Sequence, residues 1–242
     1  MLSIAIPTLN EEFHIENMLK SLLLQTVDEP IEVVVADANS SDKTREVVRS
    51  YEKHFHRVLI VPGGLPAVGR NNAAKNSRGD LIFFVDADVT FPSKTFLRDV
   101  SAYMRKRRID VAAATLRPRS TRLIDRAFVA TSNMIMKATK RFNPSGSMCI
   151  VVTRTVFEKS GGYPEQVHMS EDHDFVRSCA QHGSYDVLPH HVDFSVRRLE
   201  KEGRWGLAYK YAKVTAYRTF VGPITKPIVE YHFSYSDSES KA

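Results

Sequence analysis

Residues 81–90 read LIFFVDADVT, and this stretch decides the predicted fold. Its five apolar residues, Leu81 to Val85, are typical of a buried strand. Asp86 and Asp88 follow immediately at positions i and i+2, so the end of a rigid strand would hold both carboxylates. With a divalent cation such a pair can bridge the oxygens of a diphosphate, although two Asp residues are also common in solvated turns.

The chain before this stretch alternates between strand and helix patterns. Short apolar or β-branched runs predict strands over residues 3–6, 31–36 and 58–61. Apolar residues at helical spacing predict a helix over residues 15–23 with Asn10 as its N-cap, and a second helix begins near Lys43. This alternation predicts an α/β fold with a Rossmann-like, mostly parallel central sheet and helices on both faces.

Acidic residues gather at one edge of this predicted sheet. Asp37 ends the second strand, and Asp86 and Asp88 end the fourth. Ligands of parallel α/β folds bind beyond the carboxyl ends of the strands, so we expect a binding site there.

The pattern after residue 110 is less regular. It predicts strands over residues 111–116 and 148–152 and helices over residues 123–140, 154–160 and 172–181. Gly146 is expected to allow a close backbone approach, and Gly161 and Gly162 to end the helix before them. Because no Ser/Gly/Pro-rich linker divides the chain, residues 1–235 are predicted to be one domain, followed by a polar tail at 236–242.

The composition and the N-terminal sequence indicate the class of protein and the cellular compartment. Of the 242 residues 43% are hydrophobic and 26% charged, which excludes disordered and collagen-like chains. Cys149 and Cys179 form neither a disulfide framework nor a zinc site, which favours a reducing compartment, by default the cytoplasm. The N-terminus lacks the pattern of a signal peptide and no window suits a membrane-spanning helix, so any membrane contact is expected to be peripheral.

The net charge of +6 divides unevenly along the chain. Residues 94–142 hold 13 Lys and Arg against three Asp, and residues 195–227 hold eight against two Glu, whereas the rest is net acidic. This basic charge accompanies no zinc-ligand spacing, aromatic RNA-binding signature or helix-turn-helix, so nucleic acid is not the expected partner.

Five motifs occur in a characteristic order. They are PTLNEE, VVVADANSSD, GRNNAAKNSRGD leading into FFVDAD, GSMCIVVTRTVFEKSGGYPE, and SEDHDFVRSCAQHG. The series resembles the family-2 glycosyltransferases of the GT-A fold, which transfer a sugar from a nucleotide-activated donor, and covers about residues 3–185. The resemblance implies a nucleotide-sugar-binding half, residues 1–93, and an acceptor-side half, residues 94–235.

The resemblance also implies roles for residues of the donor half. The expected nucleotide-pocket residues are Pro7, Thr8, Leu9 and Glu11, with Asp37 reading the base or ribose of a UDP- or GDP-sugar. Arg70 would approach the phosphates or the sugar. Asp86 and Asp88 match the DxD element that holds ribose and metal, here Mn²⁺ or Mg²⁺. Glu11 as a first-turn helix carboxylate and Arg70 as a helix-surface residue are the simpler alternatives.

In the acceptor half the SEDHDF segment matches the family's ED motif. In inverting members an Asp at the position of Asp172 is the general base that deprotonates the acceptor hydroxyl, with Glu171 and Asp174 near enough in sequence to tune it. Capping of a helix by acidic residues is the alternative. If the acceptor is instead a lipid-linked polyprenyl phosphate, no base is needed and Asp172 positions it.

The last third of the chain carries weaker signals. His190, His191, Ser195, Arg197 and Arg198 are expected after the last strand; the two arginines would bind a phosphate or form a solvated turn, and neither histidine is assigned to the metal.

An apolar and aromatic helix face follows at Trp205, Tyr209, Ala212, Ala216 and Phe220. It predicts a core helix or an interfacial helix on anionic lipid, which the basic segment 94–142, with its RKRR run at 105–108, would assist.

Two rival functions stay open at this point. A nucleotidyltransferase of related fold should carry a glycine-rich, basic phosphate loop, whereas PTLNEEF is acidic and lacks glycine. The other rival is a non-catalytic nucleic-acid- or membrane-binding module on a degenerate scaffold, which would not need Asp86, Asp88 and Asp172.

Overall fold

The computed structural model describes residues 1–167, 169–222, 224 and 228. Its strands are β1 (Leu2–Thr8), β2 (Ile31–Asp37), β3 (Arg57–Pro62), β4 (Leu81–Val85), β5 (Val89–Thr90), β6 (Val111–Pro118), β7 (Cys149–Thr153) and β8 (Tyr185–Phe194). Its helices are α1 (Glu12–Leu23), α2 (Thr44–Ser50), α3 (Pro66–Lys75), α4 (Phe96–Arg107), α5 (Leu123–Thr139), α6 (Arg154–Ser160), α7 (Glu171–His182), α8 (Arg197–Lys201) and α9 (Arg204–Phe220).

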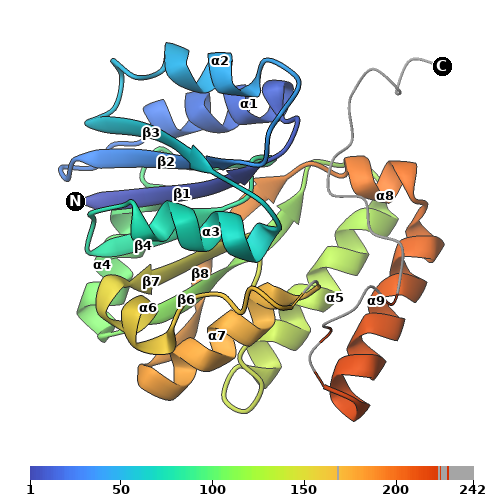
Figure 1. Ribbon diagram of the computed structural model, residues 1–242. Helices are drawn as coiled ribbons and strands as arrows, with labels where there is room; N and C mark the ends of the chain where they lie inside the picture. The colour runs from blue at the N-terminus through green and yellow to red at the C-terminus, as the bar shows by residue number, and fades with distance from the viewer. Residues whose placement is uncertain (168, 223, 225–227, 229–242) are drawn as a thin grey trace.

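The strands form one eight-stranded sheet in the order β3-β2-β1-β4-β7-β6-β8-β5 (Figure 1). The strands β1 to β4 are parallel, as predicted for this half. In the second half β6 and β8 are parallel, whereas β7 runs antiparallel to both β4 and β6, and β5 runs antiparallel to β8. The sheet is therefore mixed beyond β4, and the predicted α/β class is confirmed.

Both faces of the sheet are buried. Successive side chains of β4 alternate between two hydrophobic cores, with Phe83 in one and Phe84 in the other. The first core packs against α1 and α4, and the second against α3, α6 and α7, which lie on the opposite face of the sheet in Figure 1. Burial on both faces explains why the strands of the first half read as continuous apolar runs.

Glu32 is a fully buried carboxylate at the amino ends of the strands. It accepts hydrogen bonds from Ser3 Oγ at 2.6 Å, Arg57 Nη1 at 3.0 Å and the backbone amides of Gly79, at 3.0 Å, and Arg78. Burial alone would raise the pKa of Glu32, but these donors outweigh it and hold the pKa below its usual range. The carboxylate thus ties β1, β2 and β3 to the turn that leads into β4.

The structure corrects two predicted boundaries. Asn10 is not the N-cap of α1, because the helix starts at Glu12 with Glu11 as its cap. Asn10 has a left-handed backbone, with φ of 55°, and its side chain accepts a hydrogen bond from the Ser41 amide at 2.8 Å instead.

His190 and His191 lie inside β8 rather than after the last strand. The prediction was right for Ser195 and the two arginines, which follow Phe194.

The core interpretation of α9 is wrong for its aromatic face. Trp205 is 81% exposed and Tyr209 69% exposed, because α9 packs through Leu207 and Val214 on another side of the helix. The side chains at 212, 216 and 220 and the predicted tail at 236–242 lie outside the described residues.

Within the described ranges, no helix combines the length and the apolar character needed to cross a bilayer.

Candidate active site

Loops from the carboxyl ends of β1 and β2 are joined by Asp37. Its carboxylate accepts hydrogen bonds from Thr8 Oγ1 at 3.1 Å and from the Ser40 amide and hydroxyl at 3.0 and 2.5 Å. Thr8 and Asp37 are buried, while Pro7 and Leu9 are half-buried beside them. The structure therefore brings these four predicted pocket residues together, and the Asp37 carboxylate is already engaged in holding the two loops.

Glu11 is a buried carboxylate paired with an arginine from the far end of the chain. Its Oε1 accepts a hydrogen bond from Arg197, whereas Oε2 is buried without a hydrogen-bond partner among the described residues. Burial, reinforced by the charges of Asp88 and Asp86, raises the pKa of Glu11 to about 7 against the opposing effect of Arg197. A buried, half-satisfied carboxylate of this kind is typical of a functional site rather than of an exposed helix turn.

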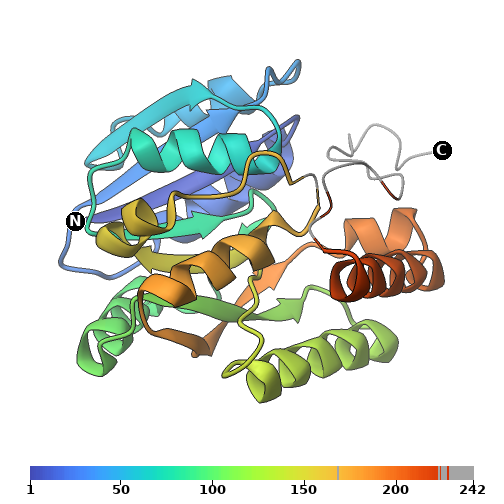
Figure 2. The same ribbon diagram turned by 60° about the horizontal axis from the view of Figure 1, so that its bottom comes forward.

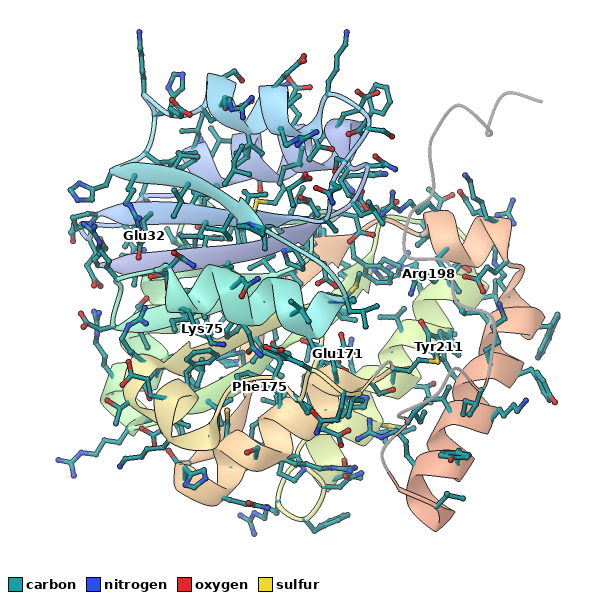
Figure 3. All side chains as sticks on the ribbon, viewed as in Figure 1. Glu32, Lys75, Glu171, Phe175, Arg198 and Tyr211 are labelled. Atoms are coloured by element: carbon teal, nitrogen blue, oxygen red, sulfur yellow. The ribbon has the colours of Figure 1, made fainter. Side chains whose placement is uncertain are left out.

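Arg70 links the DxD element to the ED motif. Its Nη2 lies 2.7 Å from Asp86 Oδ1 and its Nη1 lies 2.6 Å from Glu171 Oε1. The guanidinium is buried and also lies over the ring of Tyr163, 5.4 Å from its centroid. Figure 3 shows Glu171 between α3 and α7. Arg70 is therefore an interior residue, and the helix-surface alternative is wrong.

Asp88 is held by the second half of the chain. Its backbone oxygen accepts hydrogen bonds from the Ser195 amide at 3.2 Å and from Arg119 Nη2 at 3.3 Å, and its Oδ2 lies 3.7 Å from Arg197 Nε. Burial and the charge of Asp86 raise the pKa of Asp88 to about 6, although Arg197 and Arg198 oppose this. Arg197 thus contacts both Asp88 and Glu11, so it is not part of a solvated basic turn.

The ED motif opens helix α7 beside a glycine. A Cβ built on Gly146 would lie 2.7 Å from the backbone oxygen of Asp172, so only glycine allows this approach, as predicted. The Gly146 amide donates to His173 Nδ1 at 2.9 Å and fixes the start of the helix.

The two acidic neighbours of Asp172 have partners of their own. Glu171 pairs with Arg70, and Asp174 pairs with Arg218 of α9. Burial raises the pKa of Glu171 even though Arg70 opposes the shift.

The Asp172 carboxylate accepts no hydrogen bond from a described residue, and its side chain is 24% exposed. His173 Nδ1 lies 3.6 Å from Asp172 Oδ2, but this nitrogen accepts the hydrogen bond of the Gly146 amide and so has no proton to donate to the carboxylate.

Ser170, and not an acidic residue, is the N-cap of α7, and the cap carries no side-chain hydrogen bond. Glu171, Asp172 and Asp174 lie in the first turn, where carboxylates also favour the helix dipole, so the helix-start alternative stays open.

The donor groups of the site fit a divalent cation. Asp86, Asp88 and Glu11 Oε2, which has no hydrogen-bond partner among the described residues, offer the hard oxygen atoms that Mg²⁺ and Mn²⁺ prefer. Across the described part of the chain, no three His, Cys, Asp or Glu side chains already stand as a complete ligand set. A cation would therefore be held by one or two of these carboxylates together with ligand phosphate oxygens, which is the usual arrangement for Mg²⁺.

Sequence reasoning missed two parts of this site. Glu171 was considered only as a neighbour of Asp172, although its place in the ED motif was a usable signal. The pairing of Arg197 with Glu11 joins residues 186 positions apart, and no local pattern reports such a contact.

Comparisons with known proteins identify the family of the chain. The family model "Glycosyl transferase family 2" matches residues 3–160. The chain belongs to this family. The glycosyltransferase interpretation is therefore confirmed over the nucleotidyltransferase interpretation.

Two curated relatives are named as poly(ribitol-phosphate) glycosyltransferases. The chain is 28% identical over 179 residues, or 72% of its length, to the poly(ribitol-phosphate) beta-N-acetylglucosaminyltransferase TarS of Staphylococcus aureus, strain MW2. It is 34% identical over 102 residues, or 40% of its length, to the poly(ribitol-phosphate) beta-glucosyltransferase of Bacillus spizizenii. These matches span 31% and 16% of the relatives, so the chain corresponds to less than a third of either protein.

Solved structures confirm the GT-A fold. Residues 1–349 of S. aureus TarS in complex with UDP give a TM-score of 0.66 at 22% identity, covering 81% of this chain and 60% of that one. The mannosyltransferase PcManGT of Pyrobaculum calidifontis, in complex with GDP-Man and Mn²⁺, gives a TM-score of 0.66 at 23% identity, with 81% and 56% covered.

Proposed function

We propose that this glycosyltransferase moves a sugar from a UDP- or GDP-linked donor to an acceptor hydroxyl, with inversion and with the help of Mn²⁺ or Mg²⁺. The observation that carries the proposal is the Asp86–Arg70–Glu171 network, with contacts of 2.7 and 2.6 Å. It links the end of β4, where a diphosphate would bind, to the start of α7, where the Asp172 carboxylate accepts no hydrogen bond from a described residue. The network would thus hold the donor and the base at a fixed distance from each other.

The donor would bind over the carboxyl ends of β1, β2 and β4. Pro7, Thr8 and Leu9 would line the nucleoside pocket, and Asp37 would hold its two loops in place while reading the base or ribose. The structural neighbours with bound UDP, UDP-GlcNAc and GDP-Man support a nucleotide-sugar donor of this kind.

Asp86 and Asp88 would hold the cation together with phosphate oxygens of the donor, and the Glu11 carboxylate would lie in the adjoining nucleotide pocket. When bound, the cation would supply positive charge to the departing diphosphate. Arg70 forms an ion pair with Asp86, and Arg197 forms one with Glu11. These pairs would hold the acidic side chains together at the carboxyl ends of the strands. The bound Mn²⁺ of PcManGT supports the choice of metal.

Asp172 would act as the base. Its free carboxylate would accept the acceptor's proton while the acceptor oxygen forms its bond to the anomeric carbon and the bond to the diphosphate oxygen breaks. The names of the curated relatives support a hydroxyl-bearing acceptor of the polyol or sugar class.

Two variants test this division of labour. Asp88→Asn should abolish Mn²⁺-dependent binding of UDP and GDP, measured by calorimetry. Asp172→Asn should bind the nucleotide as the wild type does but lose about 10²- to 10⁴-fold in transfer, measured as release of nucleoside diphosphate. Lys20→Gln, on the exposed side of α1, is the matched control.

Several outcomes would contradict the proposal. Nucleotide binding that ignores both Mn²⁺ and Asp88→Asn would remove the cation from the site. Full transfer by Asp172→Asn to a hydroxyl acceptor would remove the base. If Asp172→Asn stays active only with a polyprenyl phosphate, the acceptor is the lipid-linked phosphate and Asp172 positions it.

A further inference from the structure

Helix α5 turns a broad apolar face to solvent. Its exposed large side chains, with Phe142 just beyond it, are Leu123 (78%), Ile124 (48%), Phe128 (37%), Met134 (63%), Ile135 (55%) and Phe142 (79%). Ile124, Phe128 and Ile135 recur at helical spacing, with small residues between them. The helix is anchored by its other side, where Asp125, Val129 and Met136 are buried. An exposed apolar face of this width marks an interaction surface.

The rim of this face is basic. Arg119, Arg122, Arg126, Lys137 and Arg141 are all exposed. The one acidic residue of the helix, Asp125, is buried and neutralised by Arg204, with Nε–Oδ1 and Nη2–Oδ2 distances of 2.6 and 2.9 Å. The face therefore combines apolar side chains with a positive field that nothing on the helix cancels.

Helix α9 lies near α5 and carries a second exposed patch. The two helices lie on one side of the molecule in both views, and the Arg204–Asp125 pair joins the amino end of α9 to the buried side of α5 (Figures 1 and 2). Trp205 and Tyr209 are exposed on α9, and its sequence contains no Asp or Glu. Trp and Tyr favour the interface between water and lipid because their rings are both apolar and polar.

We propose that the exposed faces of α5 and α9 form a docking surface for anionic lipid, which we call the α5/α9 surface. The basic rim and the apolar centre match such a membrane in both charge and polarity. A second copy of the chain fits less well, because a two-fold contact would bring two basic rims together. The sequence indicates an interfacial helix at α9, assisted by the basic segment 94–142, and the structure places α5 of that segment as the larger exposed apolar face.

The α5/α9 surface is connected to the ED motif. Arg218 of α9 donates to the Ser170 oxygen at 3.1 Å and pairs with Asp174, on either side of Asp172. Docking would hold the acceptor side of the site next to the bilayer, which suits an acceptor carried at a membrane surface. This last consequence rests on the proposed function, whereas the docking itself does not.

Vesicle co-sedimentation tests the proposal. The wild type should bind vesicles of 70% phosphatidylcholine and 30% phosphatidylglycerol at least tenfold more strongly than pure phosphatidylcholine, and the binding should weaken when NaCl rises from about 0.1 to 0.5 M. Ile135→Glu should reduce the partition coefficient tenfold or more, and Arg126→Gln about fivefold. Leu24→Glu is the matched control, because Leu24 is 57% exposed at the end of α1.

Three results would overturn it. One is no binding to either vesicle, and another is equal binding to both. The third is a change in oligomeric state by light scattering in Ile135→Glu while the wild type ignores vesicles, which would assign the surface to a protein partner. Circular dichroism of each variant checks the fold. Because sedimentation needs no donor, Asp172→Asn should bind vesicles like the wild type, so this test fails independently of the proposed chemistry.

Discussion

Removing the Arg70 guanidinium is the sharpest test of the site's architecture. In Arg70→Ala the carboxylates of Asp86 and Glu171 lose contacts of 2.7 and 2.6 Å, and their side chains are only 27% and 12% exposed. Breaking a buried ion pair by removing one partner costs about 3–5 kcal/mol. The two ion pairs share one arginine, so their contributions to stability are not additive. We therefore expect a total loss of about 3–5 kcal/mol, and not twice that amount. In a chain of this size, each kcal/mol of lost stability lowers Tm by about 2–4 °C, so we expect Tm to fall by roughly 10 °C.

The measurement is urea unfolding followed by far-UV circular dichroism. Trp205 is the only tryptophan and is 81% exposed, so its fluorescence would report unfolding poorly. Arg117→Ala is the matched control, because Arg117 also forms a two-pronged pair, with Asp193, but is 55% exposed. It should cost less than about 1 kcal/mol.

A double variant isolates the cause of the Arg70 effect. If unpaired buried charge causes the loss, Glu171→Gln added to Arg70→Ala should recover part of the stability. The reasoning is refuted if Arg70→Ala costs no more than Arg117→Ala, or if Glu171→Gln deepens the loss.

Three further predictions follow from individual side chains. Folding lowers the pKa of Glu32, so the stabilisation by its carboxylate is fully present above the ordinary pKa near 4.5 and is lost as the pH falls through the folded-state pKa. Glu32→Gln should therefore be about 1–3 kcal/mol less stable than the wild type at pH 7. Between pH 5 and 3 the variant should lose less stability than the wild type, as measured by urea unfolding. Gly146→Ala should displace the backbone of Asp172 and lower transfer about 10²-fold in a steady-state assay, while nucleotide binding persists. Cys149 and Cys179 are buried free thiols, and burial raises the pKa of Cys179 to about 12, so neither should react with a thiol reagent until guanidinium unfolds the chain.

Local patterns in the sequence predicted most of the elements. The strand β4 and the helix α6 begin and end where the pattern placed them, and β1, β2, β3, β6 and β7 differ from it by one or two residues at an end. The helices α4 and α8 and the short strand β5 were not predicted. Two further differences involve contacts between distant segments. Asn10 does not cap α1, because its side chain accepts a hydrogen bond from the loop after β2. The strand β8 extends through His190 and His191 because it pairs with β6 and β5.

Local periodicity and the order of motifs thus determined the α/β class, the glycosyltransferase family and the position of Asp86, Asp88 and Asp172 at element ends. Only the tertiary structure decided which groups meet there. Arg70 contacts Glu171 across 101 positions of sequence and Arg197 contacts Glu11 across 186, and no local pattern encodes such distances. The same limit applies to α5 and α9, because periodicity reports that a helix has an apolar face, whereas the packing of the whole chain decides whether anything covers it.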